Sequence, residues 1–292
     1  MSDNYLLEKH NFKMQKKYGQ NFLTDVRIPI RIAENCTDFD LSDGKIAESL
    51  MLEIGPGAGI LTKELAKRFK RVLAVEIDSE LIPILSESLA DFDNITVINR
   101  DVMEVELKEV LAPHRQDGEN LLPVSVCANL PYYITTPILM KLLEEYGEFS
   151  FITVMIQKEV ARRLCAAAGS DDYGAITAAI GLYGKATKLF DVSAGNFNPK
   201  PKVDSSVVKI SLYNPPLYTK EQIKMASTVI KAAFSMRRKT LVNTLMGLGV
   251  EKYNTKEKLS ELTERLFGNR NVRGEELSTA QFVKLAEELF AK

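Results

Sequence analysis

The sequence has no tryptophan and little cysteine or histidine, with three and two residues respectively. Cys36, Cys127 and Cys165 form no C-x-x-C pair, which argues against a disulfide framework or a metal site. No apolar run approaches the roughly 18 residues of a membrane-spanning helix. The N-terminus also lacks the apolar core and cleavage site of a secretory signal. We therefore expect an intracellular protein, cytoplasmic if it is bacterial, that holds no metal.

The net charge is only −1, but the charges are unevenly distributed. From Glu76 to Glu109 ten residues are acidic and two are basic, whereas from Lys185 to Leu245 eleven are basic and three are acidic. Either run alone would usually be a solvated face. The contrast between the two segments indicates a basic surface on one side of the molecule. Such a surface is typical of proteins that bind a phosphate backbone.

Apolar strands alternate with amphipathic helices over the first 212 residues. We expect strands at 51–54, 71–77, 95–101, 124–130 and 151–156, and two more near 186–193 and 206–212. This alternation predicts βαβ units and a parallel sheet covered by helices on both faces. Paired prolines at 215–216 indicate a linker, and only helical patterns follow them. The expected architecture is an α/β domain over residues 1–213 and a small all-helical domain over 214–292.

A glycine-rich turn, EIGPGAGILT, joins the first of these strands to its helix. Its glycines, among them Gly55 and Gly57, would let the backbone approach a ligand closely, beside the free N–H groups of a helix N-terminus. The second strand ends in VEID, where Glu76 could accept hydrogen bonds from both ribose hydroxyls of an adenosine ligand. A turn of this kind alone is more often structural, and Glu76 alone could be a surface carboxylate.

The spacing of the glycines distinguishes between adenosine cofactors. A dinucleotide site favours G-x-G-x-x-G, whereas this turn reads E-x-G-x-G-x-G with Glu53 at its head. The pattern resembles the first motif of the Rossmann-like class I methyltransferases, which use S-adenosyl-L-methionine. In that class an acid at the end of the third strand accepts a hydrogen bond from the adenine amino group, and this chain has Asp101 there. Otherwise Asp101 would be a turn residue or a helix cap.

The fourth strand ends in Asn129-Leu130-Pro131-Tyr132. The amino nitrogen of adenine is a poor nucleophile because its lone pair is delocalised into the ring. The side-chain carbonyl of Asn129 and the backbone carbonyl of Leu130 could accept its two N–H bonds and localise that lone pair. Pro131 would hold the backbone in shape, and the Tyr132 ring would stack on the base. The alternative is a strand-to-helix turn whose tyrosines belong to the core.

This stretch most closely resembles the catalytic motif of the ribosomal RNA adenine dimethyltransferases, and the likeness covers nearly the whole chain. YGQNFLTD at 18–25 resembles the N-terminal segment that closes over the cofactor in that family. The resemblance makes Asn21, Leu23 and Asn129 cofactor contacts, and it would point Gln20 into the target pocket. NFNPKPKVDSSVV at 196–208 resembles a segment whose ring, here Phe197, clamps the target adenine opposite Tyr132.

The resemblance to this family also extends to the segment that binds RNA. AAFSMRRKTLVNTL at 232–245 resembles the basic helix of the family's second domain. On the helix expected after the linker, the side chains placed to meet backbone phosphate are Lys231, Arg237, Arg238 and Lys239. Any one of them could instead be a solubilising charge. The family transfers two methyl groups to each of two adjacent adenosines in the 3′-terminal hairpin loop of small-subunit (16S) rRNA. Such an enzyme takes its target base out of the stack. The resemblance thus implies a monomer with small-subunit rRNA or the immature subunit as partner.

Other interpretations stay open. A sister group methylates one adenosine of large-subunit rRNA and confers macrolide resistance, but it usually has Asn-Ile-Pro-Tyr, so Leu130 favours the small-subunit enzymes. Those enzymes often have serine where this chain has Thr135, a conservative change. A non-catalytic assembly factor is disfavoured by the intact Asn129 and Tyr132, and a small-molecule methyltransferase by the basic segment. A DNA adenine methyltransferase is chemically possible.

Overall fold

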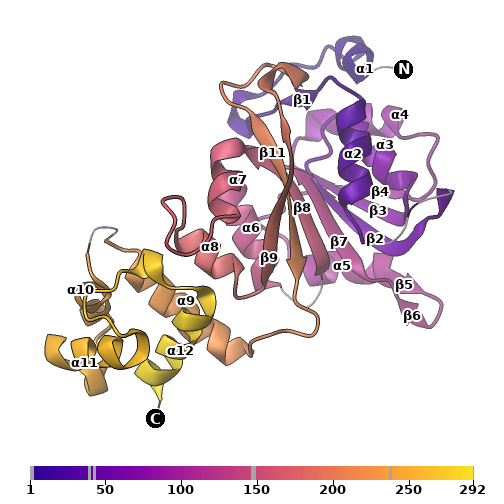
Figure 1. The fold of residues 1–292 in the computed structure, drawn as a ribbon. Coiled ribbons are helices and arrows are strands. Elements are labelled where there is room, and N and C mark those ends of the chain that lie inside the picture. The colour runs from indigo at the N-terminus through magenta and orange to yellow at the C-terminus, as the bar shows by residue number, and fades with distance from the viewer. Residues whose placement is uncertain (1–2, 39–40, 42–43, 146–148, 237–238, 292) are drawn as a thin grey trace. The chain divides into compact units, whose positions relative to one another are not determined.

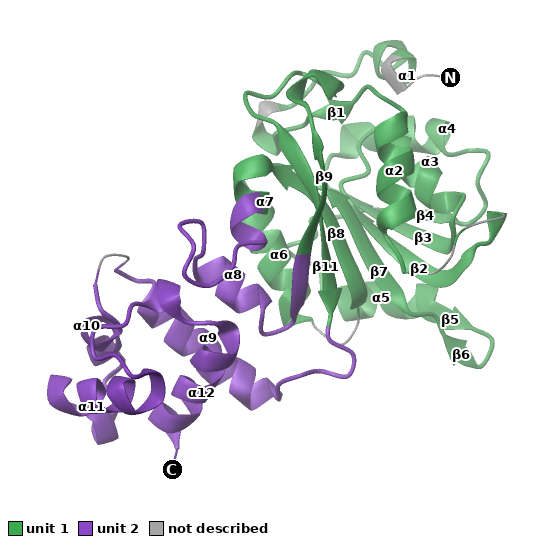
Figure 2. Cartoon of the chain, in the orientation of Figure 1, with its two compact units in different colours: residues 1–161, 187–212 green, residues 162–186, 213–292 purple. Residues whose placement is uncertain are grey.

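The computed structural model describes residues 3–38, 41, 44–145, 149–236 and 239–291. Its residues form two compact units (Figure 2). The first unit comprises Met1–Ala161 and Thr187–Leu212, and the second comprises Arg162–Ala186 and Tyr213–Lys292. The segment 162–186 therefore groups with the C-terminal helices, although residues of the first unit precede and follow it in sequence. The functional division into domains 1–213 and 214–292 stays a prediction.

The first unit is built on a seven-stranded sheet in the order β4-β3-β2-β7-β8-β11-β9 (Figure 1). The strands are β2 (Ala47–Ile54), β3 (Phe69–Glu76), β4 (Ile95–Asn99), β7 (Val124–Asn129), β8 (Phe149–Gln157), β9 (Gly184–Val192) and β11 (Ser205–Leu212). β4, β3, β2, β7 and β8 are parallel neighbours, whereas β11 runs antiparallel to β8. The sheet is therefore mixed, and the predicted parallel sheet is confirmed only for those five strands. β9 and β11 are neighbours in the sheet, and no α-helix is described between them, whereas a crossover between parallel strands usually contains one.

Helices cover the parallel strands, which explains why those strands are apolar along their length. The helices of this region are α2 (Arg27–Asn35), α3 (Ile60–Ala66), α4 (Ile82–Ser88), α5 (Leu107–Arg115), α6 (Thr135–Glu144) and α7 (Lys158–Leu164). Every residue of β7 from Val124 to Ala128 is buried. A strand covered on both faces cannot alternate polar and apolar residues. The carboxyl ends of the parallel strands consequently meet at one edge, which is where ligands bind in such sheets.

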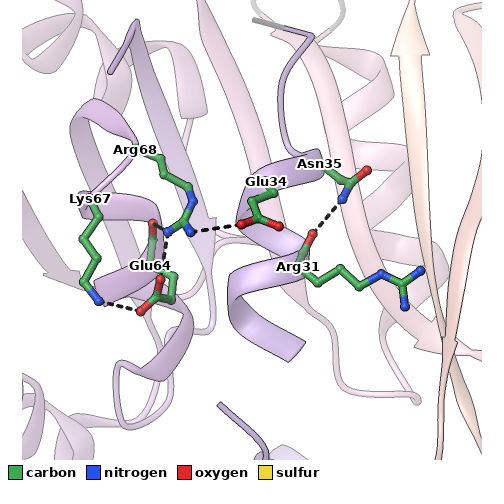
Figure 3. A network of polar contacts seen from close by, with 6 residues as sticks. All are labelled: Arg31, Glu34, Asn35, Glu64, Lys67 and Arg68. Carbon is green, nitrogen blue, oxygen red and sulfur yellow. Dashed lines mark hydrogen bonds and ion pairs between the residues drawn. The ribbon is translucent and has the colours of Figure 1, made fainter. Parts of the chain in front are cut away.

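Helices α2 and α3 are joined by polar contacts (Figure 3). Arg68, just beyond α3, forms ion pairs with Glu64 at 2.7 Å and with Glu34 of α2 at 3.4 Å. Lys67 pairs with Glu64 at 2.6 Å. Ion pairs at partly exposed positions such as these contribute roughly 1 kcal/mol or less each. The network therefore orients α2 against α3, while the buried apolar residues beneath it supply most of the stability.

The N-terminal segment is part of the folded unit. It contains α1 (Asp3–Lys9), a 3₁₀ turn at Lys16–Tyr18, and the short strand β1 (Phe22–Leu23). β1 pairs antiparallel with β10 (Phe197–Asn198), so that Leu23 lies opposite Phe197. Leu6 and Leu7 of α1 pack in a cluster with residues of α4. The segment is thus held at both ends rather than left as a tail.

The second unit contains α8 (Ala175–Ile180), α9 (Lys220–Ala233), α10 (Leu241–Leu245), α11 (Lys256–Phe267) and α12 (Thr279–Phe290). The helical character predicted after the linker is confirmed, but 232–245 is not the single basic helix expected: α9 ends at Ala233 and α10 begins at Leu241, so Lys239 lies between the two helices. Ser278 caps α12 by accepting a hydrogen bond from the backbone of Gln281, as its position before the helix indicates. α9 packs on α12, with the rings of Phe234 and Phe282 6.0 Å apart. No helix among the described residues could span a membrane.

Candidate active site at the carboxyl edge of the sheet

Two adjoining cavities lie at the carboxyl edge of the parallel strands, and both belong to the first unit. Their linings share Tyr18, Gly55, Ile77 and Pro131. The first is also lined by residues that the sequence singled out: Gln20, Asn21, Leu23, Glu53, Gly57, Glu76, Asn129, Leu130, Tyr132 and Phe197. The second is lined by Asp101, among others. The structure therefore brings together the candidate residues of six sequence segments.

The glycine-rich turn leaves its backbone open toward the cavity. Gly55 and Gly57 have φ values of 70° and 62°, in the left-handed region that side chains other than glycine rarely adopt. A Cβ atom added at Gly55 would meet no other atom within 4 Å, so the space beside it is empty. A Cβ atom at Gly57 would lie 3.2 Å from the Phe22 ring. The turn is thus shaped for close approach of a ligand on one side and of the N-terminal segment on the other.

Glu76 ends β3 as a buried carboxylate that faces the turn. One of its oxygens accepts a hydrogen bond from the Gly57 amide at 3.2 Å, and the other accepts one from the Asp78 amide at 2.8 Å. Burial raises the pKa of Glu76 to about 7, although both hydrogen bonds favour its ionised form. Because the side chain lines the cavity, it is available to hydroxyl groups of a ligand.

Glu53, two residues before Gly55, is a second buried acid at this edge. It is only 1 % exposed, and burial raises its pKa to about 8. Within the part of the chain that the structure describes, its Oε2 atom has no hydrogen-bond partner. A buried polar atom without a partner is costly, and Glu53 is one of the residues that line the first cavity. Glu53 therefore suits a ligand that carries a positively charged or hydrogen-bond-donating group.

Asp78 holds the N-terminal segment at this edge through hydrogen bonds. Its two carboxylate oxygens accept hydrogen bonds from Gln20 at 2.7 Å and from Gln15 at 3.4 Å. The side chain of Gln20, expected to point into a target pocket, lines the first cavity and is tied to Asp78. Asp78 is not among the site residues predicted from the sequence, although it follows Glu76 in VEID. Its position within that motif was the available signal.

Asn129 lies at the end of β7, and its side chain is held by the N-terminal segment. Its amide nitrogen donates a hydrogen bond to the Asn21 carbonyl oxygen at 3.2 Å. The amide of the buried Leu130 donates to the Met155 carbonyl at 3.2 Å, which ties the motif to β8. The Thr135 hydroxyl donates to the Pro131 carbonyl at 3.1 Å. A hydroxyl at position 135 thus stabilises the turn, and threonine supplies it as serine would.

Two aromatic rings from distant parts of the sequence line the same cavity. Tyr132 is half-buried, and its hydroxyl lies 2.9 Å from the Ser205 Oγ atom. Burial raises the pKa of Tyr132, so the phenol stays protonated at neutral pH. Phe197, in β10, is buried and lies opposite Leu23. Ser205 was not singled out as a site residue, although it lies within the quoted segment 196–208.

Asp101 lies at the second cavity, beyond the end of β4. One of its carboxylate oxygens accepts a hydrogen bond from the Met103 amide at 2.8 Å, as in a turn. Both the turn role and the adenine-contact role are compatible with this position, because the side chain also lines the cavity.

Of the predicted RNA contacts, Lys231 and Lys239 are exposed side chains of the second unit. Arg237 and Arg238 lie outside the described residues.

The fold and this edge define a class I methyltransferase: a mixed seven-stranded sheet with a glycine turn and acids at the strand ends. The model of the family "Ribosomal RNA adenine dimethylase" matches residues 11–290, and the chain belongs to this family. The recognition made from the motifs is confirmed, and the protein is an rRNA adenine dimethyltransferase by family.

Curated relatives match over almost the full length. The chain is 42% identical over 285 residues to ribosomal RNA small subunit methyltransferase A of Streptococcus pneumoniae, covering 97% of this chain and 94% of that protein. It is 41% identical over 283 residues to the Staphylococcus aureus protein of the same name, covering 97% and 92%.

Two solved structures share the fold. A dimethyladenosine transferase from Plasmodium falciparum superposes with a TM-score of 0.73 at 24% identity, covering 90% of this chain and 95% of that one. The 23S rRNA methyltransferase ErmE superposes with a TM-score of 0.67 at 25% identity, covering 92% and 99%.

Proposed function

We propose that this enzyme dimethylates the amino groups of two adjacent adenosines in the 3′-terminal hairpin loop of small-subunit (16S) rRNA, during ribosome biogenesis in the bacterial cytoplasm. The observation that carries the proposal is the convergence of Asn129, Tyr132 and Phe197 on one cavity beside the glycine turn. The small-subunit target is supported by full-length identity of 42% to a protein named for that subunit. The likeness to the 23S enzyme is weaker, at 25%.

The residues at this edge fit S-adenosyl-L-methionine as cofactor. The open space beside Gly55 offers room for the ligand, and the Glu76 carboxylate offers an acceptor for its hydroxyl groups. The Glu53 Oε2 atom, which has no hydrogen-bond partner among the described residues, offers a partner for its ammonium group. Asp101 at the second cavity would accept from the adenine amino group, and Asn21, Leu23, Gly57 and Asn129 would complete the contacts. When bound, the cofactor supplies an activated methyl group.

Asn129 is the residue that would activate the target nitrogen. Because its amide nitrogen already donates to the Asn21 carbonyl, its Oδ1 atom is the end free to accept from the adenine amino group. The backbone carbonyl of Leu130 would accept the second N–H bond. Two acceptors pull the nitrogen toward tetrahedral geometry and localise its lone pair. Holding that nitrogen in line with the methyl donor supplies much of the rate enhancement.

The aromatic rings would hold the base once it has left its stack. Stacking contributes roughly 1–3 kcal/mol per base, which offsets much of the few kcal/mol that unstacking costs. Tyr132 and Phe197 line the cavity from two different segments, so they can contact opposite faces of a planar ring. Pro131 restricts the backbone between Leu130 and Tyr132.

The second unit would bind the RNA backbone. Lys231 and Lys239 are exposed, and together with Arg237 and Arg238 they form the most basic stretch of the segment 185–245. Clustered lysine and arginine side chains neutralise phosphates and release counterions. We propose that this monomeric enzyme uses residues 1–213 for catalysis and residues 214–292 for RNA, with the immature small subunit or its rRNA as partner.

Transfer of tritium from labelled S-adenosyl-L-methionine tests the proposal. We expect label in immature small subunits that lack the modification, at two adjacent adenosines, and none in large-subunit rRNA. Label in 23S rRNA instead would establish the macrolide-resistance type. Binding to small subunits without label would establish an assembly factor, and preferential label in DNA would establish a DNA enzyme. Asn129→Ala, assayed in parallel, identifies label that does not arise at this site.

A further inference from the structure

The Tyr132 ring is anchored at its far end by a residue outside the Asn-Leu-Pro-Tyr motif. Its hydroxyl lies 2.9 Å from the Oγ atom of Ser205, the first residue of β11. Ser205 is only 1 % exposed and lies opposite Gln157 of β8 in the antiparallel pair. β8 also pairs with β7, which ends at Asn129. The ring therefore follows one strand of the sheet and is hydrogen-bonded to a strand two places away.

The residues beside Ser205 secure the segment that carries the second ring. The Asp204 carboxylate accepts a hydrogen bond from the Ala194 amide at 2.9 Å, in the 3₁₀ turn directly before Phe197. The Asp204 carbonyl accepts from the Lys158 amide at 3.0 Å. The start of β11 is thus bonded to β8 and α7 on one side and to the turn of Phe197 on the other. Ser205 is held as a rigid point of attachment.

We propose that Ser205 is a positioning residue that sets the plane of the Tyr132 ring, and through it the plane of the target adenine relative to Asn129 Oδ1. The inference rests on the proposed function, in which Tyr132 stacks on the base. A half-buried ring without an anchor can rotate about its side-chain torsions, whereas a hydrogen bond at the hydroxyl restrains them. Small errors in the alignment of reacting groups lower rates strongly.

The anchor matters most for the second methyl transfer. An unmodified adenine offers two N–H bonds to the two carbonyl acceptors, whereas a singly methylated adenine offers only one. With one hydrogen bond lost, stacking on the ring carries a larger share of the positioning. A ring free to rotate should therefore slow the second transfer more than the first, and singly methylated adenosine should accumulate.

The test combines three variants in a double-mutant cycle: Ser205→Ala, Tyr132→Phe and the two together. Each single variant removes one partner of the same hydrogen bond, and Tyr132→Phe keeps the ring. We expect each to lower the single-turnover rate at saturating cofactor by about 10-fold and to raise the share of singly methylated product. The double variant should be no slower than either single variant, because the bond can be lost only once.

Ser206→Ala is the matched control. Ser206 is the next residue of β11, is equally buried, and bonds to Asp191 at 2.7 Å rather than to the ring. Its removal should leave the rate and the product ratio unchanged. The inference is overturned if Ser205→Ala behaves like Ser206→Ala, or if the effects of Ser205→Ala and Tyr132→Phe multiply. If Ser205→Ala fails to fold, Tyr132→Phe still decides through the product ratio. Absence of any transfer by the unmodified enzyme would overturn the proposed function, and this inference with it.

Discussion

The side-chain amide of Asn129 donates a hydrogen bond to the backbone carbonyl of Asn21, across 3.2 Å and 108 residues of sequence. The bond joins the strand-end motif to the N-terminal segment that lies over the cavity. It also orients the amide, because a nitrogen engaged in this way leaves the carbonyl oxygen as the end that can accept from a substrate. The orientation of this one group therefore depends on the closure of the N-terminal segment.

Asn129→Asp is expected to lower methyl transfer nearly as much as Asn129→Ala, by about 10²-fold, the order lost when one hydrogen bond to a reacting group is removed. A carboxylate keeps the acceptor but cannot donate to Asn21, and it repels that carbonyl. Cofactor affinity should fall by only about 5-fold, the value of a single hydrogen bond. Single-turnover kinetics and calorimetric titration measure the two effects. Full activity of Asn129→Asp would show that the bond to Asn21 does not orient the group.

Cofactor binding should weaken as the pH falls through about 7, the pKa to which burial raises Glu76. Only the ionised carboxylate accepts hydrogen bonds with both oxygens, so protonation removes acceptors for the ligand hydroxyls. Between pH 8 and pH 6 the dissociation constant should rise up to about 10-fold. Calorimetry in buffers of different ionisation enthalpy should detect proton release on binding at pH 7. Glu76→Gln should bind more weakly and with a smaller pH dependence, because only Glu53 then titrates in this range, and a flat profile for the unmodified enzyme would contradict the assignment.

The stability of the cofactor-free protein should fall as the pH rises from about 5 to 8. Burial raises the pKa of Glu53 from 4.5 to about 8, so in this range the folded protein binds a proton that the unfolded chain has released. The free energy of unfolding therefore decreases with pH, by an amount on the order of 3 kcal/mol for this group. Urea unfolding across the range measures the slope. Glu53→Gln should make the slope shallower, leaving the part that the raised pKa of Glu76 contributes, and should be the more stable form at pH 8. An unchanged slope in Glu53→Gln would contradict the assignment.

Gly57→Ala should destabilise the protein more than Gly55→Ala. Both glycines have positive φ, so each substitution meets a backbone penalty of roughly 1–2 kcal/mol. At Gly57 the new methyl also lies 3.2 Å from the Phe22 ring, whereas at Gly55 nothing lies within 4 Å. The additional crowding should cost about 1 kcal/mol more. Denaturant unfolding without cofactor compares the two, and equal losses would show that Phe22 moves aside freely.

Lys239→Glu and Lys231→Glu should weaken RNA binding without changing cofactor affinity. Each phosphate contact removed should lower the slope of log affinity against log salt by about 1. Charge reversal at Arg237 and Arg238 should act in the same direction. Filter binding at several salt concentrations provides the slopes. Lys284→Glu, an exposed lysine of α12 in the same unit but outside the basic segment, is the control. Parallel loss of RNA and cofactor binding would indicate misfolding instead.

Features that depend on a local pattern of residues could be predicted from the sequence alone. The glycine turn, Glu76, Asp101 and Asn129 each follow an apolar strand, and parallel strands present their carboxyl ends at one edge. The helices after the linker follow from hydrophobic periodicity in the same way. Such features need only a few neighbouring residues to be recognised.

Contacts between residues that are distant in sequence could not be predicted, because they depend on the folded arrangement of the whole chain. Three contacts join separate segments of the chain: the strand pairing of Leu23 with Phe197, the hydrogen bond from Gln20 to Asp78, and the hydrogen bond between Tyr132 and Ser205. The antiparallel direction of β11 and the grouping of 162–186 with the second unit are of the same kind. The strand order β7-β8-β11 brings Ser205 near Tyr132, and that order minimises the free energy of the whole sheet rather than of any local stretch.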